Sequence, residues 1–250
     1  MKLSFVIPAY NEEACLGRCL DSILKEMAGT PCEAEIIVVN NASTDRTREI
    51  ALSYGAVRLV DEERKGLVRA RQAGTLAARG ELLANVDADN MLPPGWLRTV
   101  EEEFDGNERL VALSGPLVYY DLPRWYRAQT KFFYCLGYLS YLLSHFVLKK
   151  GGMLQGGNFV LRKSALERIG GFNTDIDFYG EDTDIARRMQ QAGLVRFTFR
   201  LPMYSSGRRI AKEGLLATGL RYAVNYVWVL VFKRPFHHAS TDVRPGRCPK

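Results

Sequence analysis

The feature that most constrains the fold is a repeated alternation of short apolar runs with longer segments whose apolar residues recur at helical spacing. The runs predicted as strands cover residues 3–8, 35–39, 57–60, 81–86, 110–114 and 158–161, and the segments predicted as helices cover 12–27, 45–54, 67–78, 96–104, 163–169 and 182–192. Strands and helices that alternate in this way favour a mainly parallel sheet with helices on both faces. The sequence therefore predicts a Rossmann-like α/β fold.

Charge is unevenly distributed along the chain. Residues 1–200 carry 25 basic and 26 acidic side chains, whereas residues 201–250 carry 9 and 2, so the net +6 of the chain comes from its end. Diffuse basicity would favour a nucleic-acid partner, which we therefore exclude. Charge confined to one end favours contact between this tail and an anionic surface such as lipid phosphate.

Two apolar segments raise the question of membrane contact. Residues 132–148 contain no Lys, Arg, Asp or Glu, but they fall short of the roughly 20 apolar residues that a spanning helix needs. Residues 214–232 place polar side chains, among them Arg221 and Asn225, on one helical face and mainly leucines and valines on the other. This pattern favours a helix that lies in the membrane interface. Packing on the protein's own core, or on a second subunit in a homodimer, would also explain it.

The cysteines indicate where the protein works. The five cysteines are odd in number and form no CxxC pair, and the chain opens on an apolar strand rather than on a signal sequence. We expect a cytoplasmic protein, peripheral at the inner face of the membrane. Cys15 and Cys19 lie four residues apart on a predicted helix, where core packing explains them better than a metal site.

Polar side chains follow three predicted strands, directly after Pro8, Val39 and Val86. Ligands of parallel α/β sheets bind at the carboxyl ends of the strands, so these segments should meet in one crevice. Asp87 and Asp89 lie in the third segment, and carboxylate oxygens are the ligands that Mg2+ and Mn2+ prefer, usually together with substrate phosphates. We expect either ion to be the cofactor at this edge of the sheet.

Seven short motifs strengthen this expectation, because they occur in the order and at the spacing of one enzyme family. They are VIPAYNEE (6–13), VVNNASTD (38–45), ARQAG (70–74), DAD (87–89), GGN (156–158), GGF (170–172) and EDTD (181–184). Together they resemble family 2 glycosyltransferases, inverting enzymes of the GT-A fold that use nucleotide-sugar donors. The resemblance implies a domain at 1–210, with a nucleotide-binding half at 1–115 and an acceptor-binding half at 116–210, followed by an amphipathic basic tail at 211–250.

The resemblance assigns the first two motifs to the donor nucleotide. Pro8, Tyr10 and Glu12 resemble positions that hold the base and the ribose: the ring of Tyr10 offers a stacking face, and Glu12 can accept from ribose hydroxyls. Strand termination and the helix dipole also explain Pro8 and Glu12. Asn40 and Asn41 stand where relatives usually carry aspartates that accept from the base, and an amide oxygen can still accept there without the charge.

Further positions resemble the catalytic part of the family pattern. Arg71 and Glu181 fall among the donor-binding residues, Asp87 would contact the ribose or the sugar, and Asp89 would coordinate the metal. Asp182 matches the catalytic base, which would take the proton of an acceptor hydroxyl as it attacks the anomeric carbon. A solvated arginine on a helix face, and ordinary acids in the first turn of a helix, would explain Arg71, Glu181 and Asp182 without a catalytic role.

Two later segments complete the predicted site. Gly157 allows the backbone to approach a ligand closely, and the amide of Asn158 could orient a sugar hydroxyl. Arg208 and Arg209 resemble residues that hold the diphosphate, although a basic pair that faces a membrane gives the same pattern. The Gln-x-x-Arg-Trp motif of processive polysaccharide synthases is absent from the sequence, which favours transfer of a single sugar.

The leading hypothesis is a metal-dependent inverting glycosyltransferase. It would move one sugar from a nucleotide-diphosphate-sugar, most simply a UDP- or GDP-sugar, to a hydroxyl acceptor that is lipid-linked or part of the cell envelope. A nucleotidyltransferase is the first alternative, but a Gly-rich loop with a basic residue should then follow the first strand. A nucleotide-sugar-binding protein without turnover is the second, and the presence of both Asp89 and Asp182 argues against it.

Overall fold

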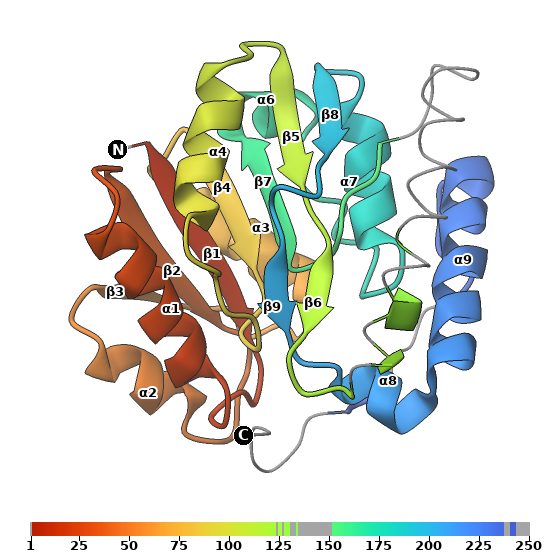
Figure 1. Ribbon diagram of the computed structural model, residues 1–250, viewed down its shortest axis with the longest axis horizontal. Helices are drawn as coiled ribbons and strands as arrows, with labels where there is room; N and C mark the ends of the chain where they lie inside the picture. The colour runs from red at the N-terminus through yellow and green to blue at the C-terminus, as the bar shows by residue number, and fades with distance from the viewer. Residues whose placement is uncertain are drawn as a thin grey trace.

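A seven-stranded sheet forms the centre of the molecule (Figure 1). The computed structural model describes residues 2–123, 125–126, 128–130, 134, 152–237 and 241–243. The strands of the sheet are β1 (Leu3–Ala9), β2 (Ala34–Asn40), β3 (Val57–Asp61), β4 (Leu82–Val86), β5 (Leu110–Ser114), β7 (Asn158–Arg162) and β8 (Leu194–Phe197), in the spatial order β3-β2-β1-β4-β7-β5-β8. β6 (Leu117–Tyr119) and β9 (Met203–Ser205) pair in a second, two-stranded sheet.

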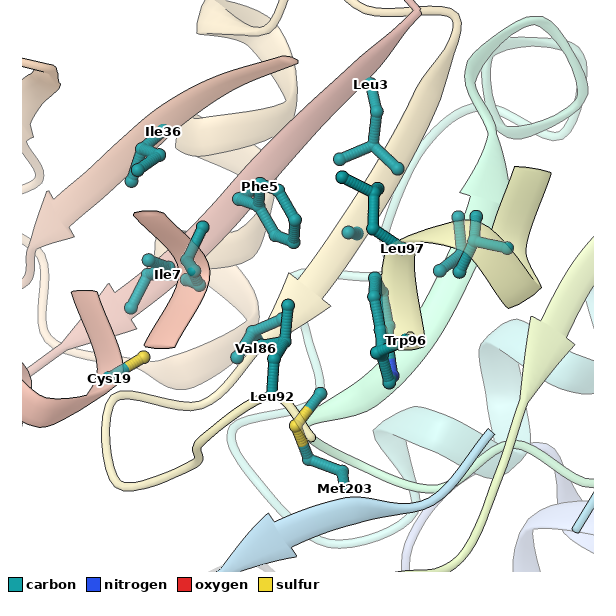
Figure 2. Packing of buried hydrophobic residues seen from close by; sticks show 14 of the residues in the cluster. Leu3, Phe5, Ile7, Cys19, Ile36, Val86, Leu92, Trp96, Leu97 and Met203 are labelled. Atoms are coloured by element: carbon teal, nitrogen blue, oxygen red, sulfur yellow. The ribbon is translucent and has the colours of Figure 1, made fainter. Parts of the chain in front are cut away.

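Helices pack against both faces of the central sheet, and they are α1 (Leu16–Ala28), α2 (Thr47–Ser53), α3 (Leu67–Ala77), α4 (Trp96–Asp105), α6 (Lys163–Arg168) and α7 (Glu181–Met189). Two further helices, α8 (Arg208–Glu213) and α9 (Leu215–Phe232), pack on each other, and α9 also packs on α7. Leu3, Phe5 and Ile7 of β1 pack with buried residues of α1 and α4 on one face (Figure 2). Val6 packs with Val68 of α3 on the other face, because successive side chains of a strand point to opposite sides. The predicted α/β fold is confirmed.

The sheet departs from a simple parallel arrangement on one side. β1, β2, β3 and β4 pair in parallel, but β7 runs antiparallel between β4 and β5. β8, which was not predicted, pairs in parallel with β5 at the edge of the sheet. Its burial alternates along four residues, so it lacks the continuous apolar run that marks the buried strands.

The topology brings the expected polar segments together. β1, β2 and β4 run in the same direction, so their carboxyl ends, at Ala9, Asn40 and Val86, lie at one edge of the sheet. Just beyond two of these ends, Asn11 and Ala42 have positive φ angles of 52° and 57°. Residues other than glycine seldom adopt this conformation, and it concentrates at functional sites.

The cysteines of α1 and the turn before it belong to the interior. Cys15 and Cys19 are both buried, as core packing predicts. Burial raises the pKa of the Cys19 thiol well above its usual value, which makes it unreactive. Cys19 and Cys32 are free thiols, whereas Cys15 is disulfide-bonded, a state that the expected reducing compartment does not favour.

The helix α9 turns its polar side towards the protein. It packs on α7 and α8, and Thr218 and Asn225 are buried on that side. The amide of Asn225 accepts the backbone N–H groups of Phe236 and His237 and donates to the carbonyl of Arg221. The exposed large hydrophobic residues of α9 are Leu216, Leu220, Tyr222, Val227, Val231 and Phe232.

The helix α9 also stands out by its length and its apolar composition. Among the described residues it is the one helix that is long and apolar enough to cross a membrane. The predicted apolar segment at 132–148 lies outside the described residues, except for Tyr134.

Asn158, at the start of β7, ties three segments of the interior together. Its amide oxygen accepts from the indole Nε1 of Trp96 at 3.2 Å, and its amide nitrogen donates to the carbonyls of Gly115 and Leu201 at 3.0 and 2.8 Å. The residue is fully buried. These contacts occupy the amide that was expected to orient a sugar hydroxyl.

We predict that Asn158→Ala lowers the free energy of unfolding by about 2–4 kcal/mol, because it leaves an indole N–H and two carbonyls buried without their partner. Urea unfolding followed by circular dichroism measures the change. Gln191→Ala removes an exposed amide and serves as the control, with an expected change within about 0.5 kcal/mol. Equal changes in the two variants would contradict the structural role of Asn158.

Candidate active site

A cavity of about 1340 Å³ lies beyond the carboxyl ends of β1 and β4 and is bounded on its other side by α8 and α9. Typical small-molecule sites measure about 300–1,000 Å³, so this one has room for two ligands. Most of the predicted site residues line it, namely Pro8, Tyr10, Glu12, Asn41, Arg71, Asp87, Asp89, Glu181, Asp182, Arg208 and Arg209. Asn40, Gly157 and Asn158 are not part of its wall.

A buried guanidinium joins the two halves of the cavity. Arg71, on α3, is 0% exposed, and its Nη2 lies 2.9 Å from Oδ1 of Asp87 and 3.4 Å from Oε1 of Glu181. Its guanidinium carbon also lies 5.0 Å from the centre of the Phe159 ring. Gly74, one turn further along α3, permits this placement, since a Cβ there would lie 2.4 Å from a methyl group of Val6. The solvated-arginine interpretation of Arg71 is therefore wrong.

Gly157 shapes the floor beneath Asp87. Its φ is +77°, and a Cβ at this position would lie 2.4 Å from Oδ2 of Asp87 and 2.9 Å from the amide nitrogen of Asn90. The carbonyl of Gly157 accepts a hydrogen bond of 2.7 Å from Asn90. The glycine therefore lets the backbone pass directly behind the carboxylate.

A second guanidinium holds two carboxylates where the segments after β1 and β4 line the cavity. We call this part the donor end, because the sequence predicts the donor nucleotide and its metal there. Arg208, the first residue of α8, donates to both carboxylate oxygens of Glu12, at 2.9 and 2.5 Å. Its Nη2 also lies 3.1 Å from Oδ2 of Asp89. The loop before it is held by Asp121, which accepts from the Ser206 hydroxyl and the Gly207 N–H, both at 2.6 Å.

Burial dominates the electrostatics of Asp89. It raises the pKa of the carboxyl to about 7, and the neighbouring carboxylates of Glu12 and Asp87 act in the same direction. The charge of Arg208 opposes the rise without cancelling it. Carboxylates that approach one another in a buried site disfavour full ionisation, so this end of the cavity favours a bound cation.

Glu181 and Asp182 open α7 after Gly180, whose φ is +79°. Asp182 accepts from the backbone N–H of Thr183 at 2.8 Å and from that of Gly156 at 3.4 Å. Burial raises the pKa of Asp182, and these two hydrogen bonds oppose the rise. Burial also raises the pKa of Glu181 to about 8, since the attraction of Arg71 is outweighed. Asp182 therefore combines a place in the cavity wall with a proton affinity above that of a solvated aspartate.

The two asparagines after β2 brace a loop. Asn40 donates to Asp61 at 2.8 Å. Asn41 donates to the carbonyls of Glu62 and Arg64 and accepts from the Gly66 N–H. These bonds shape the loop after β3, which carries Lys65. Their contact with a nucleotide base stays a prediction.

Sequence reasoning missed several residues of the wall. Lys65 lies on that loop, with its Nζ 3.8 Å from the centre of the Tyr10 ring, where it adds a cation close to the proposed base site. Four further tyrosines also line the cavity, and they are Tyr119, Tyr134, Tyr222 and Tyr226. The spacing of Tyr222 and Tyr226, four apart on α9, was a usable signal, because such residues share a helical face.

The donor end fits a divalent cation bound together with a substrate. Among the described residues no group of three or more His, Cys, Asp or Glu side chains could hold a metal by itself. Mg2+ is usually held by one or two carboxylates and completes its shell with water and substrate phosphates. Asp87 and Asp89 supply that number at the cavity wall.

Comparisons with known proteins agree with this geometry. Residues 4–170 match the family model described as glycosyl transferase family 2, and residues 145–210 match the N-terminal domain of galactosyltransferase. The chain is 33% identical over 114 residues to the dodecaprenyl-phosphate galacturonate synthase of Rhizobium johnstonii, an alignment that covers 43% of this chain and 34% of that protein. The chain spans about a third of the length of several curated relatives that it matches.

Solved structures show the same fold. TarS from S. aureus superposes with a TM-score of 0.64 at 18% identity, covering 93% of this chain and 73% of that chain. The mannosyltransferase PcManGT from Pyrobaculum calidifontis, in complex with GDP-Man and Mn2+, superposes with a TM-score of 0.61 at 23% identity, covering 82% and 56%. The expected GT-A architecture is confirmed. By its match over most of its length, the chain belongs to glycosyltransferase family 2.

Proposed function

We propose that the protein transfers a single sugar, with inversion, from a nucleotide-diphosphate-sugar to a hydroxyl acceptor. The observation that carries this proposal is that Asp182 lines the same cavity as Asp87 and Asp89, with Arg71 tying Asp87 to the neighbour of Asp182. The size of the cavity, which leaves room for two ligands, supports binding of an acceptor next to a donor. Membership of the family disfavours the nucleotidyltransferase alternative.

The carboxylate of Asp182 would remove the proton of the acceptor hydroxyl. The acceptor oxygen then attacks the anomeric carbon on the face opposite the nucleotide, and the bond to the diphosphate breaks as the new glycosidic bond forms. Arg208 and Arg209 line the wall and would stabilise the departing diphosphate through charge-assisted hydrogen bonds. A bound Mn2+ or Mg2+, held by Asp89 and Asp87, would supply Lewis-acid stabilisation of the same charge.

The bound Mn2+ in PcManGT supports the choice of metal, and its GDP-Man supports a nucleotide-sugar donor. We propose UDP- and GDP-sugars as the donors. The donor would bind to the half of the chain before residue 116. The name of the Rhizobium johnstonii relative, a dodecaprenyl-phosphate galacturonate synthase, supports a lipid-linked acceptor.

We also propose that α9 rests on an anionic membrane surface, at the cytoplasmic face. Its polar side faces the protein, and Leu216, Leu220 and Val227 are exposed on the other side. Lys233 and Arg234 follow the helix and are exposed, which suits anionic head groups. A lipid-linked acceptor would then reach the part of the cavity that α9 lines.

Asp182→Asn should lower kcat by about 10²- to 10⁴-fold and leave donor affinity unchanged, because the amide cannot take a proton. Release of UDP or GDP from donor sugars, with polyprenyl phosphates supplied as acceptors, measures turnover. Asp175→Asn makes the same change at an exposed position outside the cavity, and its turnover should match the wild type. Unchanged turnover in Asp182→Asn would exclude this base.

The pH dependence of kcat/KM should show an acidic limb. Asp182 acts only when deprotonated, and its pKa is raised by burial, so activity should increase with pH through a midpoint above the usual aspartate value of about 4. Initial rates across pH 4–9 in buffers of constant ionic strength measure the midpoint. An acidic limb at or below about pH 4 would contradict this assignment.

Leu220→Glu should weaken binding to vesicles that contain phosphatidylserine by about tenfold, because it removes a large apolar side chain from the interface and adds a charge that anionic lipid repels. Leu76→Glu makes the same change at an exposed position on α3, and this variant should bind the vesicles as the wild type does. Co-sedimentation at low salt measures both. Equal binding, or a dimer that Leu220→Glu dissociates, would instead favour a protein partner for α9.

A further inference from the structure

The donor end of the cavity contains a cation of its own. Arg208 bridges Glu12 and Asp89, and all three side chains are at least 85% buried, with exposures of 15%, 7% and 12%. Glu12 is the residue proposed to accept from ribose hydroxyls, and Asp89 is the proposed metal ligand. One guanidinium therefore occupies both carboxylates that the donor and its metal would use.

Arg208 and a divalent cation compete for Asp89. Carboxylates converge on this part of the wall from β1, β4 and α7, and two arginines meet them: Arg71 on Asp87 and Glu181, and Arg208 on Glu12 and Asp89. A divalent ion at Asp89 would lie within a few ångströms of the Arg208 guanidinium, and like charges at such distances in a protein repel strongly. An ion at Asp89 would therefore compete with Arg208 for this carboxylate.

The two arginines differ in their freedom to move. The side chain of Arg71 is 0% exposed and packs on the Phe159 ring, whereas that of Arg208 is 15% exposed. Its backbone is anchored separately, through Asp121 before α8 and through the ion pair of Glu213, at the end of α8, with Arg221 of α9. The long side chain can therefore change partners while α8 stays in place.

We propose that Arg208 is a resident counter-ion of the empty donor site, which exchanges Glu12 and Asp89 for the diphosphate of the donor when metal and nucleotide bind. Its exchange makes binding of the metal and the nucleotide cooperative: the diphosphate offers Arg208 a new partner, and its departure frees Asp89 for the ion. This inference rests on the proposed function for the identity of the nucleotide ligand, but not for the competition between Arg208 and the metal.

The test measures Mn2+ binding without any nucleotide, from the signal of free Mn2+ in electron paramagnetic resonance. Arg208→Gln removes the competing charge and should tighten Mn2+ binding by about tenfold. Lys212→Gln makes the same change of charge on an exposed residue of α8 that donates to the carbonyl of Asp242, and its Mn2+ affinity should stay within about twofold of the wild type. Unchanged or weaker Mn2+ binding in Arg208→Gln would overturn the proposal.

A second arm adds UDP or GDP to the Mn2+-loaded proteins. Arg208→Gln should bind them about ten- to a hundredfold more weakly than the wild type, because a charge-assisted contact to the diphosphate is lost. Tighter metal binding together with weaker nucleotide binding is the signature of the exchange. Nucleotide binding that Arg208→Gln leaves unchanged would overturn it, since the diphosphate would then not be the new partner of Arg208.

Two controls separate the possible failures. If wild-type protein binds neither UDP nor GDP, the proposed function is contradicted, and the nucleotide-free Mn2+ titration still decides the competition. If Arg208→Gln does not fold, Arg208→Lys replaces it: lysine keeps the charge but cannot bridge two carboxylates in the same fork geometry. Mn2+ affinity should then rise by a smaller factor than about tenfold, and no rise would overturn the proposal.

Discussion

The organisation of the site depends on one buried ion-pair bridge, from Arg71 to Asp87 and Glu181. A guanidinium with no solvent exposure is destabilising unless charges of opposite sign meet it. Asp87 comes from the end of β4 and Glu181 from the start of α7, so the same contact fixes the end of β4 relative to the start of α7. Asp182 follows Glu181 directly, and its position in the cavity is set by this bridge.

A second arginine repeats the pattern under different constraints. Arg71 is enclosed and permanent, whereas Arg208 reaches its two carboxylates from a short helix at the rim. Arg71 thus holds β4 and α7 together, whereas Arg208 balances the charges of Glu12 and Asp89 until the donor binds. Burial raises the pKa values of Asp89 and Glu181, and the attraction of Arg208 and Arg71 opposes the rise without cancelling it.

Much of this arrangement follows from sequence alone. The alternation of strands and helices determines which strand ends meet, and so Asp87 and Asp89 could be assigned to one crevice with the segments after β1 and β2. Arg71 and Asp182 were assigned to the same site by their resemblance to family motifs. The partners of a side chain could not be predicted in the same way. Asn158 shares its motif with Gly157, yet it points into the interior. The sequence also did not predict the antiparallel direction of β7 or the edge strand β8, because both depend on long-range pairing rather than on a local pattern.

The helix α9 shows the same limit. Periodicity separates its polar and apolar faces but does not tell which one meets the protein, and the structure turns Asn225 inwards and Leu220 outwards.

The proposed function requires that the cavity bind a nucleotide sugar together with a divalent ion. Thermal unfolding with UDP-, GDP- and dTDP-sugars, each with and without Mn2+, tests it most directly. One donor should raise Tm by about 5 °C or more near a hundred times its Kd, and only with Mn2+. The absence of any Mn2+-dependent rise would contradict the account.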